Sequence, residues 1–190
     1  MWPWEHLAVG YLLYSVSLRL VYGNRPGDAA TVALAFATQL PDLVDKPLAW
    51  VFDVLPSGLS LAHSLLFALP LSALVVLVAV RRGSPAIGSA FAIGYLSHLA
   101  GDVAYPYFVG DGLRVGFLLW PLVPASPEPT VGFLSLVIRF FEQFLAFLGT
   151  PRGQLYVVFE ALLLATAIGL WMADGCPILT FARRSLFNRS

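Results

Sequence analysis

Long apolar runs dominate this chain, and most of its charged residues stand near the ends of those runs. Hydrophobic residues make up 58% of the 190 residues, charged residues make up only 12%, and the mean hydropathy is +0.79. Soluble domains have about 25% charged residues. The pattern therefore predicts an integral membrane protein whose apolar runs form helices, because a spanning helix needs roughly 20 apolar residues.

The runs predict an all-α, polytopic transmembrane helical bundle that forms a single domain over residues 1–190. About five spans are expected, at residues 4–22, 28–40, 60–80, 86–105 and 154–173. The second run is short for a full crossing, because Pro41 is expected to end it. Residues 50–59 are expected to form a loop or an interfacial segment. Residues 106–129 are expected to form a loop whose length is typical of a lid, a binding segment or a disordered segment.

Residues 131–148 are predicted to form a helix that lies along the membrane surface. Less apolar side chains recur there at spacings of three and four residues, which places them on one helical face. They are Arg139, Glu142, Gln143 and Ala146. The domain is accordingly expected to have a core at about residues 1–110 and C-terminal helices at 131–173. A crossing of the membrane by residues 131–148 stays open as an alternative.

The basic residues are distributed unevenly between the two predicted membrane faces. With five spans, one face receives Arg19, Arg25, Arg81, Arg82, Arg183, Arg184 and Arg189. The opposite face receives Lys46 and Arg114. Cytoplasmic loops carry an excess of Lys and Arg, so the arginine-rich face is expected to be cytoplasmic. The prediction is a protein of the cell (inner or plasma) membrane, with the lipid bilayer as its partner and an oligomeric state that is left open.

The charge excludes one class of protein, and the cysteine content excludes two kinds of cysteine site. The net charge is zero, and no basic stripe is present that would supply the electrostatic attraction of a nucleic-acid-binding protein. Cys176 is the single cysteine, so an internal disulfide and a cysteine-rich zinc site are also excluded.

His98 and Asp102 stand four residues apart in an apolar segment, which places both on one face of the predicted fourth span. Ionisable groups near a hydrocarbon layer are costly unless they are paired, hydrated or bound to a metal, so they mark a functional site. Further His and Asp residues are expected at the same, extracytoplasmic depth. The predicted metal ligands are His6, Asp42, Asp45, His63, His98 and Asp102.

Imidazole and carboxylate ligands suit a divalent metal, with zinc expected first and manganese or iron as alternatives. This number of ligands is compatible with one or two ions. Asp45, His63 and Asp102 are also predicted to be catalytic, together with a metal-activated water. Simpler interpretations exist. Asp42 and Asp45 are also typical of an exposed turn, and both His6 and His63 are also typical of interfacial residues. Their common depth favours the metal site.

Three motifs and one histidine resemble a known family of membrane proteins. The motifs are LPDLVDKP at 40–47, LAHSLLFALP at 61–70 and GYLSHLAGDVAYP at 94–106, and the histidine is His6. Over about residues 1–110 the chain resembles the DUF457 family of membrane-bound, predicted metal-dependent hydrolases, whose bacterial members are described as LexA-regulated, YdjM-like inner-membrane proteins. The family's first-helix His and its PDxxD-like, (T/A)HS and HxxxD elements match His6, Asp42 and Asp45, His63 and Ser64, and His98 and Asp102.

The resemblance implies a hydrolase, because the family is similar to zinc-dependent phospholipase C, which acts on phosphoesters. One position departs from the family. Many members carry a basic residue shortly before the (T/A)HS element, where this chain has Gly58, Leu59 and Ser60. The chain is therefore predicted to be a membrane-bound metal-dependent hydrolase of a phosphoester or lipid-type substrate. The alternatives are an ion- or proton-coupled transporter and a non-catalytic scaffold held together by a metal.

Overall fold

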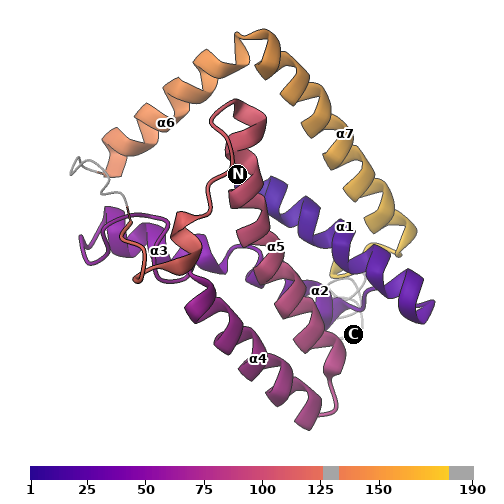
Figure 1. Ribbon diagram of the computed structural model, residues 1–190. Coiled ribbons are helices and arrows are strands. Elements are labelled where there is room, and N and C mark those ends of the chain that lie inside the picture. Colours follow the sequence, from indigo (N-terminus) through magenta and orange to yellow (C-terminus); the bar gives the residue numbers. More distant parts are fainter. Residues whose placement is uncertain (126–132, 180–190) are drawn as a thin grey trace, which may run out of the picture. The chain divides into compact units, whose positions relative to one another are not determined.

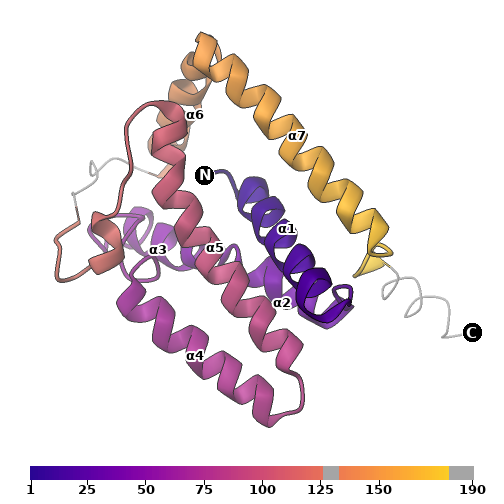
Figure 2. The same ribbon diagram turned by 45° about the vertical axis from the view of Figure 1, so that its right-hand side comes forward.

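The computed structural model describes residues 1–125 and 133–179, and every regular element within them is helical (Figures 1 and 2). In chain order the elements are α1 (Pro3–Tyr22), α2 (Asp28–Ala37), α3 (Leu40–Trp50), α4 (Leu65–Arg81), α5 (Pro85–Val109), the 3₁₀ helix η1 (Gly116–Leu119), α6 (Phe133–Leu148) and α7 (Pro151–Ala173). The prediction of an all-α fold is confirmed. Val131, Arg183, Arg184 and Arg189 lie outside the described residues.

The helices fall into two compact units. The first comprises Met1–Gln39, Leu71–His98 and Leu163–Ser190, and the second comprises Leu40–Pro70 and Leu99–Leu162. Helices α1 and α2 therefore belong wholly to the first unit, whereas α3, η1 and α6 belong wholly to the second. Helices α4, α5 and α7 each run from one unit into the other.

Helix α1 has sequence-encoded signals at both ends. Pro3 is its first residue, where a missing N–H costs nothing. The Glu5 carboxylate accepts a hydrogen bond from the backbone N–H of Trp2 at 2.7 Å and so caps the first turn. At the other end Gly23 adopts a left-handed conformation with φ of 63°. Glycine adopts this conformation without the steric cost of a Cβ atom, so the helix ends there.

A small hydrophobic core joins α1, α2 and α5 in the first unit. Its buried members are Tyr11, Tyr14, Ala30, Leu34 and Ala90. Helix α5 approaches α2 closely at Gly94, where a Cβ atom would lie 2.8 Å from the Leu34 carbonyl oxygen. The absence of a side chain at this glycine therefore allows the two helix backbones to pack together.

A buried carboxylate links the C-terminal end of α7 to α1, also in the first unit. Asp174 follows the last residue of α7, and its side chain is fully buried. It accepts hydrogen bonds from the Tyr11 hydroxyl at 2.7 Å and the Ser15 hydroxyl at 2.6 Å, and it forms an ion pair with Arg19. These donors lie one turn apart on α1, so they present a single polar stripe to the carboxylate.

In the second unit, the beginning of α3 differs from the prediction. Pro41 does not end a helix that covers residues 28–40. Helix α2 ends at Ala37, a short turn follows, and Pro41 lies in the first turn of α3. Proline is tolerated there because the N–H groups of the first turn have no partner within the helix.

Helix α4 also begins later than expected. The sequence predicts a span from residue 60, but α4 starts at Leu65 and residues 60–64 form turns. Ser64 marks the boundary, because its hydroxyl accepts the backbone N–H of Leu66 at 3.2 Å. The expected position of His63, one turn inside a helix, is therefore wrong, since this residue lies in the turn before α4.

Among the described residues, α7 is the single helix that is long and apolar enough to cross a membrane unaided. It has 23 residues, and its most apolar window has a mean hydropathy of 2.0. Helices α2 and α4 have 10 and 17 residues. At 1.5 Å per residue they are shorter than the roughly 30 Å hydrocarbon core. The five predicted spans are therefore not confirmed.

Candidate metal centre

His63 is held by the carboxylate of Asp45. The Asp45 side chain is fully buried, and one of its oxygens lies 2.8 Å from Nδ1 of His63. The same carboxylate accepts the backbone N–H groups of Ser60 and Ala62, each at 2.9 Å, and that of His63 at 3.2 Å. These bonds satisfy three backbone N–H groups of the turn before α4, so the turn can hold His63 without helical hydrogen bonds.

Two further carboxylates face the other ring nitrogen of His63. Its Nε2 lies 3.6 Å from Oδ1 of Asp42 on α3 and 3.3 Å from Oδ2 of Asp102 on α5. Burial by itself would lower the pKa of His63, but the neighbouring carboxylates, with Asp102 the strongest, outweigh burial and raise the pKa to about 10. The pocket around this imidazole therefore favours a positive charge at Nε2.

His98 is oriented by a backbone carbonyl. Its Nδ1 lies 2.7 Å from the carbonyl oxygen of Thr38, which can only accept a hydrogen bond. The hydrogen of the neutral ring is therefore on Nδ1, and Nε2 keeps the lone pair that a metal requires. His6 on α1 stacks on His98, with ring centroids 3.7 Å apart and an interplanar angle of 14°.

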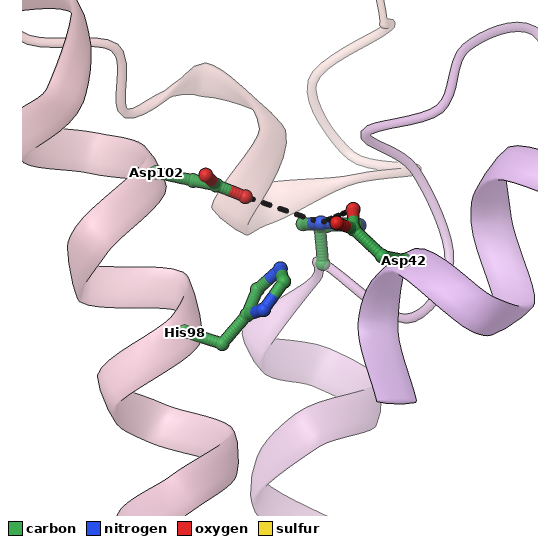
Figure 3. A group of neighbouring side chains, drawn as sticks. Asp42, His98 and Asp102 are labelled. Atoms are coloured by element: carbon green, nitrogen blue, oxygen red, sulfur yellow. Dashed lines mark ion pairs between the residues drawn. The ribbon is translucent and has the colours of Figure 1, made fainter. Parts of the chain in front are cut away.

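Four of the six predicted ligands come together. Asp42, His63, His98 and Asp102 each offer one ligand atom, and these atoms all lie within 4.8 Å of one another. Figure 3 shows the side chains of Asp42, His98 and Asp102 directed toward a common centre. Both aspartates form ion pairs with Nε2 of His63 there. Asp102 follows His98 by one turn of α5, as the sequence predicts. The other two predicted ligands, His6 and Asp45, do not belong to this group.

The separations around His63 match those between atoms that share one ion. A hydrogen bond between a charged imidazole and a carboxylate is about 2.7–2.9 Å long. Two ligand atoms on a tetrahedral zinc ion, each about 2.1 Å from the metal, are about 3.4 Å apart. The distances of 3.3 and 3.6 Å from Nε2 to the two aspartates lie close to the second value. The donor set of two imidazoles and two carboxylates also fits zinc, manganese or iron.

Lys46 and Phe117 contact the group and were not among the predicted metal ligands or catalytic residues. Lys46 forms an ion pair with Oδ2 of Asp42 at 2.6 Å, which leaves Oδ1 toward His63. The spacing of four residues on α3 is a signal that sequence analysis could have used. Phe117 of η1 packs edge-on against the His63 ring, with centroids 6.0 Å apart. No local pattern indicates this contact.

Ser64 forms hydrogen bonds with the segment that carries Phe117. Its hydroxyl lies 2.6 Å from the carbonyl oxygen of Trp120 and 3.3 Å from that of Leu118. Phe117 itself is buried, with 6% of its surface exposed. The segment around η1 therefore covers one side of the His63 imidazole and keeps water from that side.

A family model described as YdjM inner membrane protein matches residues 1–180. No curated protein and no solved structure matches the chain.

Proposed function

Because the chain belongs to the YdjM inner membrane protein family, we propose that it is a membrane-bound metalloenzyme that hydrolyses a phosphoester or lipid-type ester. Asp42, His63, His98 and Asp102 are the proposed ligands of a divalent ion, for which zinc is the first candidate. The observation that carries the proposal is the placement of Nε2 of His63 between two carboxylates, at 3.3 and 3.6 Å. Two acceptors and a ring nitrogen at these distances require a positive charge among them.

An ion held by Asp42, His63, His98 and Asp102 would supply an activated water and would polarise the ester oxygen. The burial of the ligand residues sets the direction from which water and substrate approach. The side chains of Asp42 and Asp102 are 11% and 9% exposed, whereas that of His63 is fully buried. Water and substrate therefore enter on the side of the carboxylates. Asp102 has a second carboxylate oxygen besides the one that faces His63, and we assign to it the acceptance of a proton from the attacking water.

The family supports a location in the inner membrane. The finer part of the proposal is a polytopic arrangement in which the site faces the extracytoplasmic side. Long helices with ionisable groups, such as α5 with His98 and Asp102, would then be shielded from lipid by their neighbours. The unequal distribution of arginines along the sequence supports this orientation.

The proposal is tested on detergent-purified protein by measuring bound metals and hydrolysis together. Wild-type protein, His63→Asn and Asp102→Asn are compared with Asp111→Asn, which changes an exposed carboxylate outside the group. Substrates are bis(p-nitrophenyl) phosphate and phospholipids in mixed micelles. The expected result is bound zinc, manganese or iron and turnover in the wild-type and Asp111→Asn proteins, and loss of both in the two site variants. Bound metal without turnover of either substrate would instead favour a non-catalytic scaffold.

A further inference from the structure

Both oxygens of the Asp45 carboxylate are engaged in hydrogen bonds within the protein. Its Oδ2 contacts Nδ1 of His63 and accepts the backbone N–H groups of Ser60 and His63, and its Oδ1 accepts that of Ala62. The side chain is fully buried, and it stands outside the group of four residues whose ligand atoms converge. A carboxylate with both oxygens committed to hydrogen bonds is held in one orientation and cannot also turn toward an ion.

The two histidines of the group are arranged in the same way. Each has Nδ1 against an oxygen that only accepts hydrogen bonds, namely the Asp45 carboxylate for His63 and the Thr38 carbonyl for His98. In each neutral ring the hydrogen is therefore on Nδ1 and the lone pair is on Nε2. Histidines that bind metals are commonly oriented by such a partner on the second nitrogen, and its loss costs about 10–100-fold in metal affinity.

We propose that Asp45 is a positioning residue, which holds the His63 ring so that Nε2 faces the metal, and that it is not a metal ligand. This inference rests on the metal centre of the proposed function. It replaces the roles of metal ligand and catalytic residue that the sequence predicts for Asp45.

An asparagine amide at position 45 cannot accept all of the hydrogen bonds that the Asp45 carboxylate accepts. The carboxylate meets four N–H groups and accepts from all of them. Asparagine has one acceptor oxygen and an NH₂ group, so its NH₂ must face at least one of these donors. If the NH₂ takes the place of Oδ1, it faces the backbone N–H of Ala62, and this contact between two donors displaces the turn that carries His63. If it takes the place of Oδ2, it faces Nδ1 of His63 together with the backbone N–H groups of Ser60 and His63. The ring then carries its hydrogen on Nε2, where the metal should bind.

The test compares Asp45→Asn with Asp42→Asn in detergent-purified protein, using cobalt(II) as the spectroscopic probe and zinc for affinities. Cobalt absorption reports which atoms coordinate the ion, and competition with a chromophoric chelator gives the zinc affinity. Circular dichroism and size-exclusion elution report folding. We expect Asp45→Asn to keep the wild-type band positions at saturating cobalt while its zinc affinity falls about 10–100-fold. Asp42→Asn, which changes a ligand, should shift the cobalt bands.

Each other result overturns the proposal in a recognisable way. A cobalt spectrum of Asp45→Asn that shifts as that of Asp42→Asn does would make Asp45 a ligand. An unchanged zinc affinity in folded Asp45→Asn would leave Asp45 a purely structural role. A wild-type protein that binds no cobalt would overturn the metal centre itself. If Asp45→Asn does not fold, Asp45→Glu takes its place, because it keeps the carboxylate. Wild-type bands with weaker zinc binding in that variant support the proposal, and shifted bands overturn it.

Discussion

Nε2 of His63 lies 3.3 Å from Oδ2 of Asp102, and this contact places a buried imidazole where only a proton or a metal ion can separate it from a carboxylate. In the metal-free protein a proton on Nε2 of His63 lies between the imidazole and the carboxylate. The ordinary pKa of a histidine is 6.5, and here the surrounding carboxylates outweigh burial and raise the pKa to about 10. Metal and proton therefore compete for one nitrogen.

The first prediction is that zinc binding strengthens as the pH rises. Because the pKa of His63 is raised, the ring is protonated throughout the range from pH 6.5 to 8.5, and each ion must displace one proton. The dissociation constant for zinc should therefore fall about tenfold per pH unit in this range. Chelator competition measures the constant, and calorimetry in two buffers counts the released proton. His63→Asn, which lacks a proposed ligand, should show neither zinc binding nor this proton release. A wild-type affinity that does not change with pH would contradict the assignment of His63 as a ligand.

The second prediction concerns the close approach of α5 to α2. In Gly94→Ala the new Cβ atom would lie 2.8 Å from the Leu34 carbonyl oxygen and 3.1 Å from the Ala37 side chain. Neither neighbour is the far end of a flexible side chain, so one helix must shift. We expect a loss of about 1–3 kcal/mol of stability, seen as a lower midpoint of thermal unfolding in detergent.

Gly169→Ala in α7 is the matched control for this change, because no atom lies within 4 Å of the Cβ position there. Its unfolding midpoint should stay at or above the wild-type value, since alanine favours a helix more than glycine does. Equal midpoints for Gly94→Ala and Gly169→Ala would show that the two helices do not pack as closely as described.

The third prediction is that the buried ion pair between Arg19 and Asp174 stabilises the junction of α1 and α7. Asp174→Ala removes the acceptor of three side-chain donors and leaves Arg19 without its carboxylate. Breaking a buried pair costs about 3–5 kcal/mol. Because Arg19 is 34% exposed, we expect a loss at or below the lower end of this range. Chemical or thermal unfolding in detergent measures it.

Two further variants separate the ion pair from its hydrogen bonds. Tyr11→Phe removes one donor to the Asp174 carboxylate and should cost about 1.5 kcal/mol, the lower end of the range for a hydrogen bond to a charged group. Asp111→Asn alters an exposed carboxylate and should change stability by less than about 0.5 kcal/mol. If Asp174→Ala lowered the stability no more than Asp111→Asn does, the ion pair and the hydrogen bonds of Asp174 would contribute nothing to stability.

The sequence predicted the parts of the site that depend on local periodicity. His98 and Asp102 lie one turn apart on α5 because helix geometry alone relates residues four apart. The position of His63 required long-range information. The carboxylate of Asp45 accepts the N–H groups of the turn at residues 60–63, so the chain is not helical there. An apolar run alone predicts a helix at this place, and so the beginning of α4 was misplaced.

Other features had no signal in the sequence. The orienting partner of His98 is the backbone carbonyl of Thr38, and every residue has such a carbonyl. Phe117 covers His63 from a segment that looked like an irregular connection. Asp174 stands just after an apolar helix, where a carboxylate in contact with water is the simplest expectation, yet its side chain is fully buried. These contacts depend on which elements meet in space, and periodicity does not report that.

The last prediction concerns the side of the membrane on which each loop lies. Arg81 is the last residue of α4 and Arg82 follows it in a turn, and cytoplasmic loops carry an excess of such residues. Val54, in the bend after α3, is 66% exposed and belongs to the segment that the sequence assigns to the opposite face. Single cysteines introduced as Val54→Cys and Arg82→Cys should therefore react on opposite sides of the inner membrane.

The experiment uses a Cys176→Ser background, which removes the single native thiol. A membrane-impermeant maleimide added to intact spheroplasts should label Val54→Cys. It should label Arg82→Cys only after the membrane is permeabilised. Labelling of both positions in intact spheroplasts would leave residues 54 and 82 on the same side, so an even number of crossings would separate them. Labelling of Arg82→Cys alone would reverse the orientation, and the carboxylates of the metal centre would then accept substrate from the cytoplasm.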